Sequence, residues 1–178
     1  YNNIATSNET FFWYAELMDE SWENCVKFFN NNRILVKKYL EYREEKILKE
    51  DLKKYLHEFC ASKKDEIFAI LGNEISSLPS IIMKEMETNL FRKMVRMREL
   101  EIEKHLLPDK DLDDNIETAI KSAVYMNYRY LYNDKNIADS TPTLHCALFF
   151  FMRNYAYSGM FRYSRKGDFS PLFLKFSL

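Results

Sequence analysis

The sequence predicts a mainly α-helical protein whose C-terminal residues leave the helical pattern as a β-hairpin or an ordered loop. Apolar residues recur at steps of three and four through most of the chain, and no alternating pattern appears before Met160. Only three glycines occur among 178 residues, and 47% of the residues are hydrophobic, enough for a real core. We expect one domain, with a helical body at 1–156 and a basic, aromatic recognition hairpin and tail at 157–178.

Start and stop signals divide the body into helices. A capping box, Thr6-x-x-Glu9, precedes the first helix, which either continues through 19–21 or breaks there. The run Asn30-Asn31-Asn32 separates it from the second helix, and Ser62 and Gly72 bracket a short one. The expected helices cover about 6–29, 33–46, 51–61, 65–71, 79–107, 111–131 and 140–155.

The two longest expected helices carry clear apolar stripes. The stripe of the first is Ile82, Met86, Leu90, Met94 and Met97. The stripe of the second is Ile116, Ile120, Val124 and Leu131. Steps of three and four place each stripe on one helix face, so we expect both stripes in the core.

Cysteine usage and hydropathy favour a cytoplasmic protein that does not enter a membrane. The three cysteines are an odd number and fall in expected helices, which favours buried, reduced thiols. The longest apolar run, 146–152, is far too short to cross a bilayer and predicts a buried helix.

Several kinds of active site are disfavoured. His57 and Cys60 share a helix face, but nothing nearby completes a zinc site, and Glu101 with His105 lacks the repeated Glu-x-x-His spacing of a di-iron bundle. His145 adjoins Cys146 in sequence, but neighbours on a helix do not face each other. Glycine-rich nucleotide loops are also missing. We therefore predict no catalytic, cofactor-binding or metal site within this chain.

The basic run 92–98 has two interpretations. It could follow a phosphate backbone, but the same helix continues with glutamates at spacings that predict the ion pairs Arg96–Glu99 and Arg98–Glu101. A solvated, self-paired helix face is the favoured interpretation.

The most informative stretch is Asn154-Tyr-Ala-Tyr-Ser-Gly-Met-Phe-Arg-Tyr-Ser-Arg-Lys-Gly-Asp-Phe169, which holds two of the three glycines. From residue 152 onward five basic residues face one acid, so the first 151 residues carry a net charge of −5. Glycines beside arginines and aromatics suit close approach to a nucleic acid, with phosphate pairing and base stacking. The alternative is a basic surface loop that does not bind nucleic acid.

This stretch resembles the target-recognition hairpin of the Dam-like adenine-specific DNA methyltransferases. The resemblance implies that double-stranded DNA is bound in its major groove and that Arg162 pairs with a guanine. Ser158 and Met160 would wedge beside bases as the adenine is flipped out, while Tyr157 and Tyr163 pack or stack. The remaining implied contacts are Arg165 and Lys166 to phosphates, and Pro171 in the family's following proline position.

The chain departs from the family in two respects. The family's S-adenosylmethionine motif and its Asp-Pro-Pro-Tyr motif are absent, and the tail after Phe169 differs. We expect the recognition part of a methyltransferase, which does not catalyse methyl transfer alone. Either the chain is a truncated recognition domain, or a catalytic domain lies outside it. The start at Tyr1 fits a fragment, a processed product or part of a longer protein. The alternative is a stand-alone helical interaction domain without a nucleic-acid role.

Overall fold

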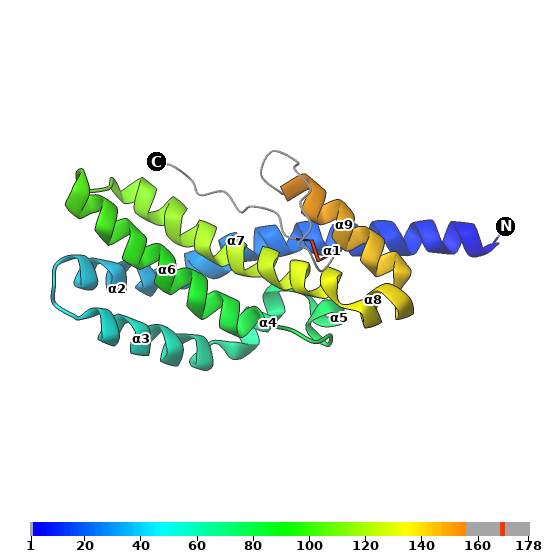
Figure 1. Ribbon diagram of the computed structural model, residues 1–178, viewed down its shortest axis with the longest axis horizontal. Helices are drawn as coiled ribbons and strands as arrows, with labels where there is room; N and C mark the ends of the chain where they lie inside the picture. Colours follow the sequence, from blue (N-terminus) through cyan, green and yellow to red (C-terminus); the bar gives the residue numbers. More distant parts are fainter. Residues whose placement is uncertain (1, 156–167, 170–178) are drawn as a thin grey trace. The chain divides into compact units, whose positions relative to one another are not determined.

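The computed structural model describes residues 2–155 and 168–169, with side chains from Ser7 onward (Figure 1). These described residues form nine helices and no strand, so the mainly helical prediction is confirmed. The predicted hairpin falls almost entirely outside them. The helices are α1 (Asn2–Asn31), α2 (Ile34–Arg43), α3 (Lys49–Ser62), α4 (Lys64–Ile70), α5 (Asn73–Ser76), α6 (Ile82–Glu103), α7 (Asp109–Asn133), α8 (Lys135–Ser140) and α9 (Pro142–Tyr155).

The chain divides into two compact units, a division that the sequence had not suggested. We call Ser21–Met126 the central unit and the remainder, Tyr1–Glu20 with Asn127–Leu178, the terminal unit. Helices α1 and α7 contribute residues to both. Each unit is described by itself below.

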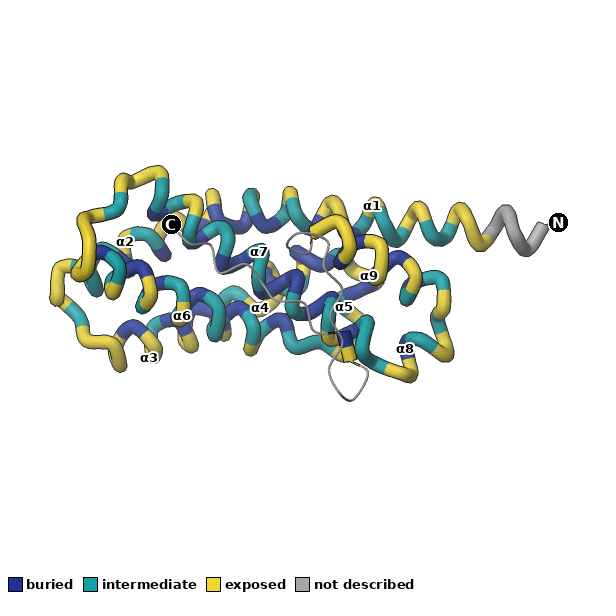
Figure 2. The backbone as a smooth tube through the Cα atoms, turned by 45° about the horizontal axis from the view of Figure 1, so that its top comes forward, coloured by how far each residue is buried: buried dark blue, intermediate teal, exposed yellow. Residues whose placement is uncertain are grey.

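The central unit is built on the long helices α6 and α7. Helix α6 packs along α3 in this unit (Figure 1). Both predicted apolar stripes are buried, since the five stripe residues of α6 and the stripe residues Ile116, Ile120 and Val124 of α7 are at most 1% exposed. Buried and exposed positions alternate along each long helix, as Figure 2 shows. The stripe prediction is therefore confirmed, because one apolar face at helical spacing has to be removed from water.

Helix α1 is longer than predicted. It begins at Asn2 and continues without a break to Asn31, so Thr6 lies inside the helix and the capping box does not start it. The helix also continues through 19–21. No glycine or proline occurs in this helix, so nothing in its backbone requires it to stop there.

Two further boundaries correct the sequence prediction. Ser62 is the last residue of α3 and its Oγ donates a hydrogen bond to the Phe59 carbonyl, so it does not cap α4. Helix α2 ends at Arg43, three residues early, where Glu45 takes a left-handed φ of 60°. Gly72 does follow the end of α4 as predicted, with φ 78°, a value that glycine adopts at little cost.

The terminal unit has an aromatic core. Rings of α7 and α9 meet there, as in the edge-on pair Tyr128–Phe151 with centroids 4.9 Å apart. The prediction that 146–152 forms a buried helix is confirmed only in part. Ala147, Leu148 and Phe151 are buried, but Phe150 is 42% exposed. A helix that is apolar on all sides must present one side outward when only one face is covered.

Candidate nucleic-acid interface

The residues predicted to contact DNA all lie outside the described residues. Seven of them belong to, and one follows, the segment 156–167, which we call the basic segment. The predicted contacts are Tyr157, Ser158, Met160, Arg162, Tyr163, Arg165, Lys166 and Pro171. The structure instead describes the residues that flank the basic segment, Tyr155 before it and Asp168 and Phe169 after it.

Tyr155, the last residue of α9, makes a ring contact and a side-chain hydrogen bond within the terminal unit. Its ring centroid lies 4.5 Å from that of Phe151, one helical turn earlier. Its hydroxyl donates to Oδ1 of Asp19, on the first part of α1, at 3.0 Å. Burial, and then this hydrogen bond to a carboxylate, raise the pKa of Tyr155. Tyr155, the residue just before the basic segment, is therefore attached to the terminal unit.

Phe169, which follows the basic segment after one residue, is held more firmly. Its side chain is buried, at 1% exposure, with the ring edge-on to Tyr132 at 5.6 Å. Its backbone N–H donates to Oδ1 of Asn133 at 2.9 Å, and its carbonyl accepts from Nδ2 of the same side chain at 3.2 Å. The described residues on either side of the basic segment, Tyr155 and Phe169, are thus both attached to the terminal unit.

Asn133 lies at the junction of two helices. Asn133 is the last residue of α7, and Asp134 then caps α8 by accepting from the N–H of Asn136 at 2.9 Å. A carboxamide carries one acceptor and one donor group and so can pair with both polar groups of a peptide backbone, as a neighbouring strand would. We call this two-bond pairing the Asn133–Phe169 clasp.

His145 supports the same region from α9. Its ring stacks on Tyr132 with centroids 4.4 Å apart and an interplanar angle of 7°, and its Nε2 lies 3.1 Å from the Tyr132 carbonyl oxygen. The role observed for His145 is therefore to pack against the residue that packs on Phe169. Nothing in the sequence indicated this contact, because the two residues lie on different helices.

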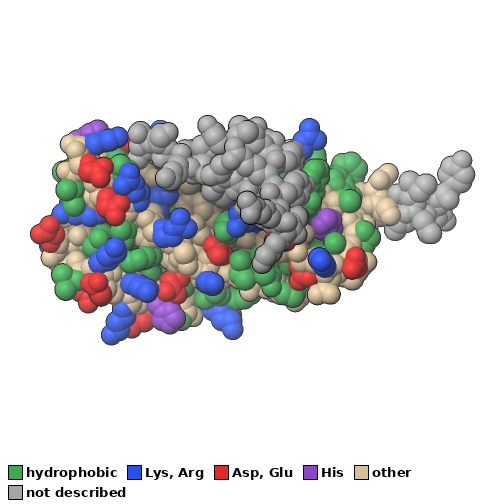
Figure 3. Space-filling view, viewed as in Figure 1, with side chains coloured by type: hydrophobic (Ala, Val, Ile, Leu, Met, Phe, Trp, Pro, Cys, Tyr) green, Lys and Arg blue, Asp and Glu red, His purple; other side chains and the backbone are tan. Residues whose placement is uncertain are grey.

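Two arginines of the basic run of α6 form ion pairs. Arg96 pairs with Glu99 at 3.1 Å, as predicted. Arg98 does not pair with Glu101; it pairs with Glu45, beyond the end of α2, at 2.9 Å. Basic and acidic side chains are interspersed over the face of the molecule in Figure 3. The pair Arg96–Glu99 agrees with a solvated, self-paired helix face, whereas Arg98 is paired to a residue outside the helix.

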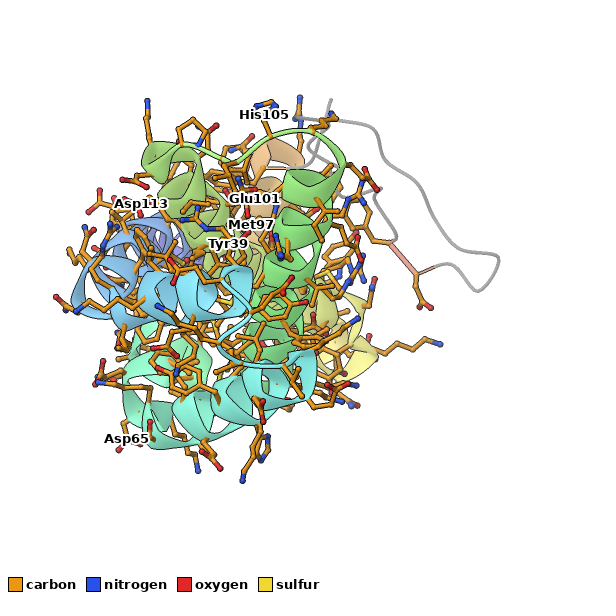
Figure 4. All side chains as sticks on the ribbon, turned by 90° about the vertical axis from the view of Figure 1, so that its left-hand side faces the viewer. Tyr39, Asp65, Met97, Glu101, His105 and Asp113 are labelled. Atoms are coloured by element: carbon orange, nitrogen blue, oxygen red, sulfur yellow. The ribbon has the colours of Figure 1, made fainter. Side chains whose placement is uncertain are left out.

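Glu101 is a residue that sequence reasoning placed wrongly. Its buried carboxylate accepts from the Tyr39 hydroxyl at 2.6 Å and from the Leu107 N–H at 2.9 Å, and lies 3.6 Å from the Arg43 guanidinium. Tyr39 and Glu101 face each other in Figure 4, while His105 lies at the outside. Burial, and then the hydrogen bond to Glu101, raise the pKa of Tyr39 well above its usual range. The available signal was the spacing, since Glu101 is the next position of the stripe after Met97.

The cysteines differ from one another. Cys25 and Cys60 are buried as predicted, and burial is the main cause that raises the pKa of each thiol to about 12. Cys146 is exposed, which contradicts the prediction, because it lies on the uncovered side of α9. A buried thiol with a raised pKa is a poor nucleophile, so Cys25 and Cys60 have a packing role.

His57 and Cys60, which share a face of α3, differ in their surroundings. Nδ1 of His57 lies 2.9 Å from the Glu87 carboxylate, and Cys60 is buried. Within 2–155 and 168–169, no three histidine, cysteine, aspartate or glutamate side chains gather as metal ligands would. In the same part of the chain, no helix combines the length and apolarity needed to cross a bilayer.

Comparisons of the chain with protein-family models, with curated proteins and with solved structures gave no match.

Proposed function

We propose that this chain is the DNA-recognition part of an adenine-specific DNA methyltransferase and binds double-stranded DNA through the basic segment and Pro171. The observation that carries the proposal is the motif of the basic segment, with its arginines, tyrosines and glycines, placed between two anchored flanks. A loop that must direct side chains at base edges needs fixed ends, because phosphate and base contacts both depend on placement.

The chain's own contribution is to bind DNA and to read bases. Arg162 would donate to the acceptor edge of a guanine, and Arg165 and Lys166 would neutralise phosphates. Ser158, Met160 and the two tyrosines would fill the space beside a displaced adenine.

Within residues 2–155 and 168–169, the groups that could hold S-adenosylmethionine do not form a site for it. Gly72, the glycine among the described residues, ends a helix in the central unit and belongs to no cofactor turn. The buried acid Glu101 is enclosed by protein donors, which leaves it unable to bind ribose hydroxyls. In this proposal, methyl transfer in the complete enzyme belongs to a catalytic domain outside this chain.

Selection of duplexes from a randomised pool tests the proposal. The wild-type chain should enrich a short site containing a guanine, and Arg162→Ala should lose about 1–3 kcal/mol of discrimination at that one position. Arg96→Ala is a matched control, since it removes an arginine that pairs with Glu99 on α6. Failure of the wild-type chain to enrich any sequence would refute base reading.

A second function, a helical protein-interaction domain, is favoured by one observation in the terminal unit. Phe12, Trp13 and Phe150 are 63%, 41% and 42% exposed, and Phe11 contacts Phe150 with ring centroids 5.9 Å apart. Exposed aromatics that gather in one unit are typical of binding surfaces. Binding through them would respond little to salt, whereas phosphate contacts weaken steeply as salt is added.

A further inference from the structure

The outward side of the first part of α1 combines carboxylates with aromatic rings. Five exposed residues are separated there by steps of three and four, which places them on one side of the helix (Figure 2). We call them the acid–aromatic face: Glu9, Phe12, Trp13, Glu16 and Glu20. Met18, on the opposite side of the same part of α1, is fully buried. The acid–aromatic face therefore points away from the side of α1 that is buried.

The aromatic part of this face continues onto α9. The rings of Phe12 and its neighbour Phe11 have centroids 5.5 Å apart, and Phe11 in turn lies 5.9 Å from Phe150. Phe149 and Phe150 are both exposed, so apolar surface extends from one helix to the other within the terminal unit. Exposed apolar side chains that form a continuous surface are typical of a docking site for another macromolecule.

Charge decides which kind of macromolecule fits this surface. The first 20 residues hold four acidic and no basic residues, and three of the acids belong to the acid–aromatic face. On α9 the exposed Arg153 lies about one turn after Phe150. The carboxylates of α1 repel DNA phosphates and anionic lipid headgroups. Pairing with the same face of a second copy would set carboxylates against carboxylates. A partner with positive charge complements the face.

We propose that the acid–aromatic face binds a basic, amphipathic polypeptide segment of a partner protein. This inference rests on the second function proposed above and is independent of DNA binding by the basic segment. Apolar side chains of the partner cover Phe12 and Trp13, while its lysines or arginines lie near Glu9 and Glu16 or over the aromatic rings. Because exposed charges at the edge of an interface add little affinity, they select the partner, and the affinity itself depends little on salt.

Two synthetic helix-forming peptides separate charge from apolarity. Both carry leucines at spacings of three and four, and the other positions are lysines in one peptide and glutamates in the other. The wild-type chain should bind the lysine peptide about tenfold more tightly than the glutamate peptide. Replacing both Glu9 and Glu16 with glutamine should remove most of this preference. Replacing both Phe12 and Trp13 with alanine should weaken binding of the lysine peptide by about tenfold.

Matched controls come from exposed residues of the central unit. Ile102→Ala removes an apolar side chain that is 68% exposed, and Glu58→Gln removes an exposed carboxylate on α3. Neither variant should change binding of either peptide. Because all the replaced side chains are exposed, urea unfolding should give the same stability for each variant as for the wild-type chain.

Fluorescence of Trp13 provides a local readout. The chain has two tryptophans, so Trp22→Phe leaves Trp13 as the single emitter. Its emission should move to shorter wavelength when the lysine peptide covers the exposed indole. Binding of neither peptide, equal binding of both, or binding that leaves the emission unchanged would overturn the inference.

Other occupants give different results. Self-association of the peptide-free chain that is lost when Phe12 and Trp13 are replaced would identify a second copy as the occupant and overturn the inference. Binding to vesicles of anionic lipid through the same two residues would overturn it equally. No DNA is present in these measurements, so a negative result leaves the proposed DNA recognition standing, and a chain that binds no duplex leaves this inference standing.

Discussion

The central and terminal units are held together by different chemistry. The central unit packs methionine and aliphatic stripes of α6 and α7, with one buried carboxylate, Glu101, satisfied by donors from α2 and from the residues after α6. The terminal unit packs aromatic rings and ties chain segments with polar side chains, as in Tyr155–Asp19 and Asn133–Phe169. The first arrangement tolerates exchange among apolar residues of similar size, whereas the second depends on particular groups in particular places.

This difference indicates where function can be changed without unfolding the protein. Substitutions in the α6 stripe should alter stability alone. Substitutions in the terminal unit should act on the flanks of the basic segment, and therefore on DNA binding if the proposed function is right.

Alkaline pH should have the largest effect, and it should originate mainly in the central unit. Burial raises the pKa of Cys25 and Cys60 from 9.0 to about 12, so the unfolded thiols ionise first. Their contribution is complete below about pH 9 and is lost as pH rises toward 12, at roughly 1.4 kcal/mol per pH unit for each thiol at most. Urea unfolding between pH 8 and 11 measures the loss. Cys60→Ala should flatten the dependence, and Cys146→Ala should leave it unchanged.

Glu101→Ala should cost about 3 kcal/mol in the free energy of unfolding, because it leaves the Tyr39 hydroxyl and the Leu107 N–H without their acceptor. Glu99→Ala is the control on the same helix, where an exposed pair with Arg96 is lost, and should cost less than about 1 kcal/mol. Equal losses in the two variants, measured by urea unfolding, would mean that the buried carboxylate does not hold the central unit together.

The contribution of aromatic ring contacts to the stability of the terminal unit can be separated from that of apolar burial. Phe151→Leu keeps an apolar side chain but removes ring contacts with Tyr128 and Tyr155, and should cost about 1–2 kcal/mol. Met94→Leu, at a fully buried position of α6, should cost less than Phe151→Leu. A larger loss of stability for Met94→Leu than for Phe151→Leu, measured by thermal unfolding, would show that the two units do not differ in this way.

Thiol labelling gives the mildest test. At pH 8 one cysteine, Cys146, should react quickly with a small disulfide reagent, while Cys25 and Cys60 should react only when the chain opens. Mass spectrometry of the labelled peptides identifies the site. Early labelling of Cys60 would contradict the packing of the central unit.

The fold could be predicted from the sequence where a pattern has a single structural explanation. The stripe of α6 and the turn at Gly72 followed from helical spacing and from backbone freedom at glycine. The buried position of Glu101 was not predicted. The four-residue spacing of the stripe continues at Glu101 with a polar residue, and its hydrogen-bond partners lie on other elements. Local pattern cannot reveal partners that are distant in sequence.

The candidate site was likewise predictable only in part from the sequence. The motif around Arg162 was visible in the sequence, and its contacts with DNA remain a prediction. The clasp was not visible, since Asn133 at the end of one helix and Phe169 share no sequence pattern. An asparagine there suits a helix end or a turn equally well, and only the packing of the terminal unit selects the backbone of Phe169 as its partner.

The salt dependence of duplex binding is the decisive test of whether the basic segment contacts DNA phosphates. If Arg165 and Lys166 each neutralise a phosphate, the logarithm of the association constant should fall with the logarithm of the salt concentration with a slope of about −2. Replacing both residues with alanine should abolish most of that slope, and Arg96→Ala should leave it unchanged. Duplex binding that is independent of salt, or no binding to any duplex at low salt, would refute phosphate contact by the basic segment. It would favour the exposed aromatic residues of the terminal unit as the binding surface.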